Sequence, residues 1–310
     1  MAETDYRALN ALAASPEDMI SLAETDYHSH INSLAKQIAS DPGVKIILLA
    51  GPSGSGKTTT ANLLSDAIKR HGEEAMVVSL DDFYKDASDP TYPKSKNGER
   101  DYECPDALRL SEIKDTLTAI TKGADFFLPK YDFKLACRVG MKKYSASQRR
   151  AVIVEGLHAL NPKIADPLPR AAVLKLFVSV STNINDGEER ILSGRKLRFV
   201  RRMVRDSLYR GADARRTLNM WDEVLSAEDK YLYPYKETAD IAFDTFHSFE
   251  PSVMAPFVKK LIDRELEDES PYVKTVINAL RKLTEIDPRL VPENSLIREF
   301  IPGGIYESLY

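Results

Sequence analysis

The sequence VKIILLAGPSGSGKTT, residues 44–59, decides the fold of this chain. Its first part, Val44–Ala50, is a short apolar run rich in β-branched residues, which is typical of a parallel strand buried on both faces. The residues from Gly51 to Thr58 then fit the pattern G-x-x-x-x-G-K-[ST], and apolar positions at helical spacing follow as far as Arg70. A strand, a glycine-rich loop and a helix in this order predict a phosphate-binding loop.

The residue types of this loop suit the phosphates of a nucleotide and a metal ion. Glycines let backbone N–H groups curl around phosphate oxygens, and the helix that follows adds the positive end of its dipole. We expect Lys57 to contact the β- and γ-phosphates and the Thr58 hydroxyl to bind Mg²⁺. The alternative is a flexible glycine turn with an incidental lysine, and the flanking strand and helix argue against it. The expected cofactors are ATP and Mg²⁺, and the expected nucleotide-binding residues are Gly51, Ser53, Gly54, Ser55, Gly56, Lys57, Thr58 and Thr59.

Four further strand-like runs follow along the chain, at 75–80, 151–155, 172–180 and 240–244. Strands that alternate with helices predict a parallel sheet covered on both faces. Ligands gather at the carboxyl ends of the strands in such sheets. The expected fold class is therefore α/β, a P-loop NTPase fold whose parallel sheet is flanked by helices and carries a substrate-binding insertion and a lid.

The chain divides into three expected parts. The last part reads as helical, since Val273, Ile277 and Leu280 recur at helix spacing. The middle part contains a stretch rich in Pro, Tyr, Lys and Asp at 84–148, helical only near 109–122, which we interpret as the substrate-binding insertion. The parts are a helical lead-in at 1–43, a P-loop domain at 44–250, and a helical tail packed on the core at 251–310.

Composition and charge exclude several classes of protein. The 310 residues are 43% hydrophobic and 29% charged, which is ordinary for a globular protein, and the net charge of −4 argues against a broad nucleic-acid surface. Cys104 and Cys137 lack the spacing of a metal or redox site, so we expect reduced thiols. Nothing resembles a secretory signal or approaches the ~18 apolar residues of a membrane span. We expect a cytoplasmic protein with no nucleic-acid or membrane partner, and the sequence leaves its oligomeric state open, a homo-oligomer included.

Acidic residues follow two of the expected strands. Asp81 and Asp82 come directly after the second run, and Glu155 ends the third. Phosphoryl transfer to a hydroxyl needs a group that orients the acceptor and takes its proton, which Asp81 can do, with a helix-capping aspartate as the equal alternative. Glu155 can hold Mg²⁺ or its water shell opposite Thr58, against the alternative of a surface charge at a strand end. We expect His158 to be structural.

Nine arginines lie within 186–216 of a chain that is acidic overall. Arg198, Arg202 and Arg205 are spaced so that they share one face of the expected helix. Guanidinium groups can grip phosphate oxygens, and we interpret the segment as a mobile lid that excludes water from the reaction. A solvated basic helix face is one alternative. A nucleic-acid patch is a weaker one, because no stacking aromatic residue occurs before Tyr209.

Taken together, these pieces resemble the uridine kinase and phosphoribulokinase family of P-loop kinases over residues 44–250. The resemblance implies a kinase that uses Mg·ATP to phosphorylate the 5′-hydroxyl of a pyrimidine nucleoside, a small-molecule partner such as uridine or cytidine. The ending VPENSLIREFIPGG at 291–304 is similar to the close of a bacterial uridine kinase-like subgroup. The blocks that carry the resemblance are GPSGSGKTT at 51–59, LDDFYKD at 80–86, DYECPDAL at 101–108, PKYDF at 129–133, VIVEGLHAL at 152–160 and RRMVRDSLYRG at 201–211.

The resemblance also implies roles for individual residues. The family's base is the aspartate three residues before the tyrosine, which selects Asp81 over Asp82, and Glu103 stands where the family has an aspartate on the ribose hydroxyls. The implied catalytic residues are Asp81, Lys57, Arg202 and Arg205, and the implied metal ligands are Thr58 and Glu155. The implied substrate contacts are Tyr84, Tyr102, Glu103, Tyr131, Phe133, Arg205 and Arg210.

Three positions depart from the pattern of uridine–cytidine kinases. A histidine that reads the pyrimidine is replaced by Ala136, the arginine after R-G by Ala212, and a later glutamine by Met220. Sites built to hydrogen-bond a substrate depend strongly on such groups, so uridine is the leading acceptor while another sugar or small alcohol is the alternative. A nucleotide-binding regulatory protein is a further alternative, against which the complete set of phosphate-transfer residues argues.

Overall fold

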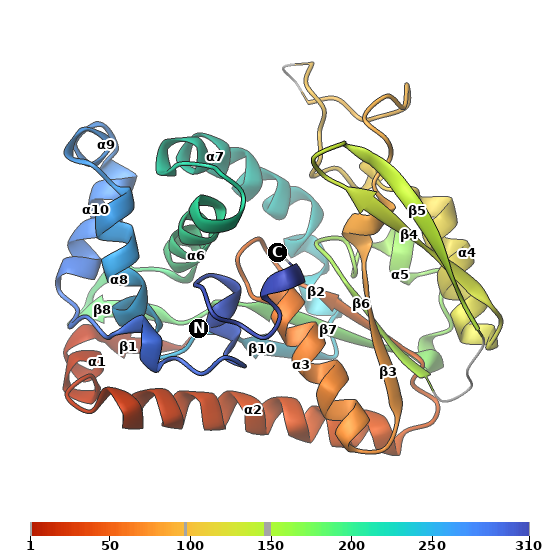
Figure 1. Ribbon diagram of the computed structural model, residues 1–310, viewed down its shortest axis with the longest axis horizontal. Coiled ribbons are helices and arrows are strands. Elements are labelled where there is room, and N and C mark those ends of the chain that lie inside the picture. The colour runs from red at the N-terminus through yellow and green to blue at the C-terminus, as the bar shows by residue number, and fades with distance from the viewer. Residues whose placement is uncertain (1, 96–97, 146–149, 310) are drawn as a thin grey trace.

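A parallel sheet of five strands forms the centre of the computed structural model, which describes residues 2–95, 98–145 and 150–309 (Figure 1). The strand order is β10-β7-β2-β6-β3, and every neighbouring pair is parallel. These strands confirm the five expected runs to within two residues at each end, and the expected α/β P-loop fold is confirmed with them. Their bounds are β2 (Ile46–Ala50), β3 (Glu74–Ser79), β6 (Arg150–Glu155), β7 (Val173–Ser179) and β10 (Ile241–Asp244).

Helices cover both faces of this sheet because successive strand residues point to opposite sides. Ile47 and Leu49 of β2 belong to one hydrophobic cluster, and Ile46 and Leu48 belong to the other. The first cluster includes α2 (Pro16–Ser40), α3 (Lys57–Arg70), α6 (Gly194–Tyr209), α7 (Ala214–Tyr231), α8 (Glu250–Leu261), α9 (Arg264–Glu269) and α10 (Pro271–Arg281). The second includes α4 (Leu110–Lys122) and α5 (Pro162–Ala165).

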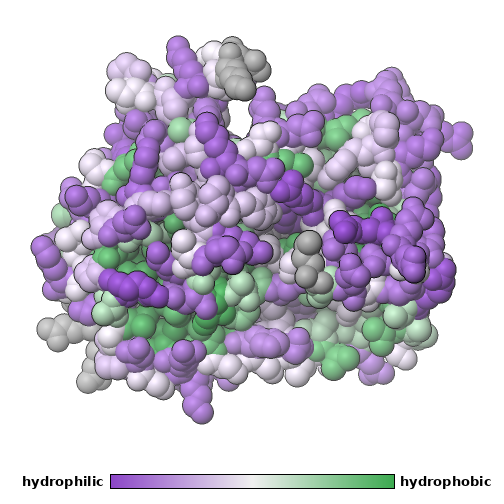
Figure 2. Space-filling model, turned by 180° about the vertical axis from the view of Figure 1, so that it is seen from behind, coloured by the Kyte–Doolittle hydropathy of each residue, from purple (hydrophilic) through white to green (hydrophobic). Residues whose placement is uncertain are grey.

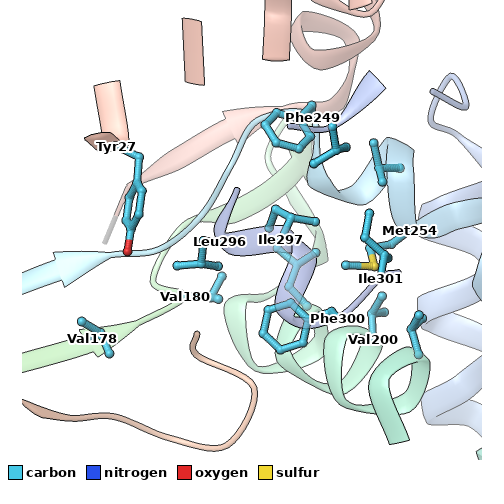
Figure 3. Close-up of a cluster of buried hydrophobic side chains, with 14 of the residues drawn as sticks. Tyr27, Val178, Val180, Val200, Phe249, Met254, Leu296, Ile297, Phe300 and Ile301 are labelled. Atoms are coloured by element: carbon cyan, nitrogen blue, oxygen red, sulfur yellow. The ribbon is translucent and has the colours of Figure 1, made fainter. Parts of the chain in front are cut away.

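The two ends of the chain share the first cluster. At the N-terminus, α1 (Tyr6–Leu12) precedes α2, which runs below α3 in Figure 1. At the C-terminus, Val273, Ile277 and Leu280 of α10 are buried. The chain then returns over the sheet in short 3-10 turns, and its buried side chains lie among those of the core (Figure 3). Both terminal segments are therefore built into the same core as the sheet.

Five strands outside the central sheet were missed by the sequence analysis. In the insertion, β4 (Phe126–Asp132) pairs antiparallel with β5 (Cys137–Tyr144), and Pro129 and Gly140 interrupt their sequence patterns. Each residue is tolerated because both strands of a two-stranded ribbon are edge strands. Of the expected insertion, 96–97 and 146–148 lie outside the described residues. The other strands, β1 (Glu3–Asp5), β8 (Asn183–Asp186) and β9 (Glu189–Leu192), form a separate sheet and are too short to show a period.

Helix α6 is a core helix, which corrects the expected lid over 186–216. Its apolar side chains Leu197, Phe199 and Met203 are fully buried, at 0% exposed. A segment that opens and closes over a site cannot keep its side chains in a packed core. Beside α6, the exposed connection 210–213 between α6 and α7 remains available for a lid.

Two buried ion pairs fix α6 to the helices beside it. The guanidinium of Arg198 donates two hydrogen bonds to Glu228 of α7, both 2.8 Å long, and each side chain is 1% exposed. Arg201 donates to both carboxylate oxygens of Glu250 in α8, at 2.6 and 2.7 Å. Arg198 is therefore not one of the phosphate-gripping residues that its place on the helix suggested, and this part of the arginine segment is not a solvated basic face.

The surface seen from behind is largely hydrophilic, with hydrophobic residues gathered low on its left side (Figure 2). Within the described ranges, no helix has the length and apolar character needed to cross a bilayer.

We expect Glu228→Gln to lower the free energy of unfolding by about 3–5 kcal/mol, because it leaves the buried Arg198 charge without its anion. Urea denaturation measures this loss. Glu223, exposed on the same helix, provides the matched control, and Glu223→Gln should change stability by less than ~0.5 kcal/mol. Equal, small losses in both variants would show that the pair does not hold α6 and α7 together.

A pH dependence follows from His158, which is 3% exposed and whose pKa burial lowers to about 4. In the unfolded chain the imidazole of His158 takes up a proton near pH ~6.5. In the folded chain the same imidazole stays neutral down to about pH 4. The contribution of neutral His158 to the free energy of unfolding is thus complete at pH values above the pKa of His158 in the unfolded chain. It is lost as the pH falls towards the pKa of His158 in the folded chain. Between pH 7 and pH 5, wild type should lose about 2 kcal/mol more unfolding free energy than His158→Gln. Urea denaturation at several pH values tests this, and parallel curves for the two proteins would contradict it.

Candidate active site

The phosphate loop between β2 and α3 has its carbonyl groups turned towards α6 and the residues after β10. Arg198 Nη1 donates to the carbonyl oxygen of Ser53 at 2.8 Å, and Arg201 Nη1 donates to that of Gly54 at 3.2 Å. Thr245 Oγ1 donates to the carbonyl oxygen of Ser55 at 2.8 Å. A trans peptide points its N–H opposite to its C=O. The N–H groups that follow these carbonyls therefore point away from α6, as a phosphate cradle requires.

Close packing behind the loop explains its glycines. Gly54 and Gly56 have φ of 72° and 83°, in the left-handed region that favours glycine. A Cβ at Gly54 would lie 2.8 Å from the carbonyl oxygen of Arg198, and one at Gly51 would lie 2.2 Å from that of Val178. The expected nucleotide-binding residues occupy this loop and the first turn of α3: Gly51, Ser53, Gly54, Ser55, Gly56, Lys57, Thr58 and Thr59.

Asp206 gathers the three arginines that were expected at the phosphates. Arg205 donates to Asp206 Oδ1 from Nε and Nη2, at 2.9 and 2.7 Å, and Arg202 Nε lies 3.2 Å from Asp206 Oδ2. Arg210 Nη1 lies 3.7 Å from Asp206 Oδ1. The charge of Arg205 lowers the pKa of Arg210 to about 10, so these cations crowd one another. A phosphate group would relieve that crowding. Asp206 was not among the residues expected at the site. Its spacing of four residues from Arg202 and from Arg210 places it beside both on a helix and could have indicated these ion pairs.

The candidate base and the candidate metal ligand lie at the ends of neighbouring strands. Asp81 belongs to the 3-10 helix η1 (Leu80–Phe83), directly after β3, and Glu155 ends β6. Ser79 pairs with Glu155 in the sheet register, and its hydroxyl donates to Glu155 Oε1 at 2.7 Å. Asp82 instead holds the hairpin, because its Oδ1 accepts from the N–H of Tyr131 at 3.1 Å. Only the first of the two aspartates is therefore left to face the loop.

These acids have perturbed protonation. Desolvation raises the pKa of Asp81, although its side chain is open to solvent, and the charges of Lys57 and Arg210 oppose that shift. Desolvation, followed by the charge of Asp81, raises the pKa of Glu155 to about 7, and Lys57 again opposes the shift. Lys57, Asp81 and Glu155 thus lie within electrostatic reach of one another. This combination of cation and acids is typical of functional sites.

The residues present fit Mg·ATP. Thr58 lies in the first turn of α3 beside the phosphate loop, and Glu155 offers a carboxylate at the adjacent strand end. Mg²⁺ in proteins keeps several waters and takes one or two protein ligands besides phosphate oxygens. Over the residues that the structure describes, no group of three His, Cys, Asp or Glu could hold a metal alone. A metal ion that arrives with the phosphates needs no such group.

The four aromatic residues expected at the acceptor form one cluster, in which the other three gather around Tyr84. Its ring centroid lies 6.3 Å from that of Tyr102 and 5.9 Å from those of Tyr131 and Phe133. Desolvation raises the pKa of Glu103 to about 7, with the charge of Arg202 opposing and that of Asp81 adding to the shift. The charges of both the arginine cluster and the candidate base therefore reach this acid. All four rings belong to the insertion, and they form a wall of aromatic rings beside the acids.

The three positions that depart from the uridine kinase pattern lie on separate segments. Ala136 is in the turn between β4 and β5, with φ of 51°, and its carbonyl oxygen accepts from the N–H of Ala87 at 2.8 Å. Ala212 is in the connection between α6 and α7, and Met220 is exposed on α7. Neither alanine side chain can form a hydrogen bond with a base, and the thioether of Met220 is only a weak acceptor.

Comparison with known proteins bears on the family. The sequence model of the "Phosphoribulokinase / Uridine kinase family" matches residues 46–250. A uridine kinase from Halobacterium salinarum is 27% identical over 62% of this chain and 76% of that protein, and one from Lactobacillus helveticus is 28% identical over 63% and 84%. A solved structure described as a possible uridine kinase from Bacillus stearothermophilus is 19% identical over 71% of this chain and 100% of that chain, with a TM-score of 0.46.

The family match covers most of the chain and includes the phosphate loop, the acids and the arginines. The resemblance drawn from the sequence is thereby confirmed. The chain belongs to the phosphoribulokinase and uridine kinase family and is a uridine kinase-like phosphotransferase that acts on a hydroxyl acceptor.

Proposed function

We propose that the chain transfers the γ-phosphate of ATP to the 5′-hydroxyl of a pyrimidine nucleoside, uridine or cytidine, to give the monophosphate. The observation that carries this proposal is the convergence of Lys57, Asp81 and Glu155 at the carboxyl ends of three neighbouring strands, where each acid feels the charge of the lysine. Ligands of open parallel sheets bind at this edge.

Each residue of this group has a distinct part in the transfer. The backbone of the phosphate loop and Lys57 would hold the phosphates, and Thr58 and Glu155 would hold Mg²⁺ with its waters. Bound Mg²⁺ supplies positive charge to the phosphate oxygens. Asp81 accepts the proton of the acceptor hydroxyl. Desolvation raises the pKa of this carboxylate and so makes it a stronger base, while the charges of Lys57 and Arg210 favour its ionised form.

The arginines held by Asp206 stabilise the charge that spreads over the phosphoryl group during transfer. Arg202 Nη1 donates to Ser53 Oγ in the phosphate loop at 2.8 Å, which places this guanidinium beside the phosphates. Arg205 and Arg210 influence the charge of Asp81 and so lie on the acceptor side. The connection 210–213 serves as the lid, because it is largely exposed and directly follows the arginines held by Asp206. Its closure would exclude water as a competing acceptor.

The wall of aromatic rings supports a nucleoside as the acceptor. Tyr102 and Phe133 are 43% and 61% exposed and offer π-faces on which a base can stack, with Tyr84 and Tyr131 packed against them. Glu103 offers a carboxylate to the ribose hydroxyls. The relatives named uridine kinases support the same assignment. The second candidate acceptor is a different small hydroxyl compound. The side chains of Ala136, Ala212 and Met220 favour it, because they stand where uridine–cytidine kinases have hydrogen-bonding side chains.

We place this reaction in the cytoplasm. Both cysteines, Cys104 and Cys137, are unpaired in the structure. Free thiols persist where the compartment keeps them reduced.

An acceptor panel tests the proposal directly. ADP release with Mg·ATP should be strong with uridine or cytidine, weak with ribose and pantothenate, and absent with 5′-deoxyuridine, which lacks the reacting hydroxyl. Mass spectrometry of the product should show one added phosphate. Release with another acceptor alone would favour the second candidate, and release with none of them would overturn the proposal.

Substitution of the base separates chemistry from binding. We expect Asp81→Asn to lower kcat by at least ~10³-fold while the Kd for ATP changes less than about twofold, because the proton acceptor is lost and the phosphate contacts remain. Asp82→Asn is the matched control, and it should keep kcat within about tenfold because Asp82 supports the hairpin. Lys57→Ala should damage both binding and transfer. Equal loss in the two aspartate variants would show that the base is misassigned.

A further inference from the structure

The C-terminal segment 291–306 lies directly against the phosphate loop. A Cβ at Gly56 would meet the side chain of Leu296 at 2.7 Å. Ile297 and Phe300, both 0% exposed, hold the segment in the core beside Val200 and Met254 (Figure 3). The backbone of this segment is therefore fixed next to the site that the nucleotide would occupy.

A buried carboxylate of this segment contacts the helix that follows the loop. Glu299 Oε2 accepts a hydrogen bond from the N–H of Thr59 at 3.2 Å, and Glu299 is 5% exposed. Among the residues that the structure describes, this is the only hydrogen bond that the Glu299 side chain makes, and no Lys, Arg or His forms an ion pair with it. A buried carboxylate is costly without compensating positive charge. Here the compensation comes from the N-terminus of α3, where the first N–H groups have no carbonyl partner within the helix and the helix dipole favours an anion.

A nucleotide needs the same N–H groups. The phosphate loop and the first turn of its helix cradle the α- and β-phosphates with their backbone N–H groups. We expect Lys57 at the β- and γ-phosphates and Thr58 at Mg²⁺. The next N–H along the helix, that of Thr59, is therefore the one expected at the α-phosphate. Two anions that approach one donor at a site poor in water repel each other strongly.

We propose that Glu299 is part of the donor-nucleotide site, where its carboxylate competes with the α-phosphate for the N–H of Thr59 and thereby sets the affinity for the nucleotide. This inference rests on the proposed function only in that the phosphate loop takes ATP or ADP. The nucleotide displaces the Glu299 side chain, while the backbone stays in place because Ile297 and Phe300 remain packed in the core.

The test compares nucleotides that carry an α-phosphate with adenosine, which has none. Glu299→Gln keeps the size of the side chain and an oxygen that can accept from Thr59, but it removes the charge. In isothermal titration calorimetry on the full chain, ADP and AMP should bind the variant about tenfold more tightly than wild type, a change of about 1.4 kcal/mol. Adenosine should bind both proteins equally.

Two further variants make the result specific. Glu293→Gln removes an exposed carboxylate from the same segment and should leave ADP binding unchanged. Glu299→Ala removes the charge through a different side chain and should reproduce the gain, with circular dichroism and urea denaturation used to show that each variant is folded. An unchanged or weaker ADP affinity in a folded Glu299→Gln or Glu299→Ala protein would overturn the inference. Failure of wild type to bind ADP at all would instead overturn the proposed function, on which the inference rests.

Discussion

The structure depends on one set of interactions, the hydrogen bonds from buried arginines to the carbonyl oxygens of the phosphate loop. Arg198 and Arg201 each hold one carbonyl of the loop and are each neutralised by a glutamate from another helix. Because Glu228 Oε1 also accepts from the N–H of Ser53 at 2.8 Å, the loop is bound from both its donor and its acceptor groups. Helices α6, α7 and α8 are consequently tied to the loop, and a shift of any of them would alter the cradle for phosphate.

The same arrangement separates two kinds of arginine on one helix. Arg198 and Arg201 point into the protein and have carboxylates of their own, whereas Arg202 and Arg205 share a single aspartate. The inner pair is neutral as a unit and serves the fold. The outer group keeps surplus positive charge opposite the acids at the strand ends. On this helix, surplus positive charge is thus kept on the side where a phosphate would bind, which is how a site becomes preorganised for an anionic transition state.

The sequence was informative where structure is local and uninformative where distant segments meet. The strand, loop and helix around the phosphate loop are coded by adjacent residues, and so are the five core strands. The hairpin was hidden because Pro129 and Gly140 break its pattern, although a two-stranded ribbon tolerates both. Arg198 and Arg202 look alike in a helical pattern, and only Glu228, 30 residues away in sequence, distinguishes the first. Contacts of that kind depend on the tertiary fold and have no period to detect.

The contact between Glu299 and Thr59 links the stability of the ligand-free site to its affinity for ligand. The N-terminus of α3 attracts an anion whether or not a nucleotide is present. A carboxylate from the chain itself satisfies that attraction and stabilises the ligand-free form. Nucleotide binding breaks this contact, so its free energy reduces the net free energy of binding. Affinity depends on the difference in free energy between the nucleotide-bound protein and the ligand-free protein. A segment far from the phosphate loop in sequence can therefore adjust nucleotide affinity without changing any residue of the phosphate loop.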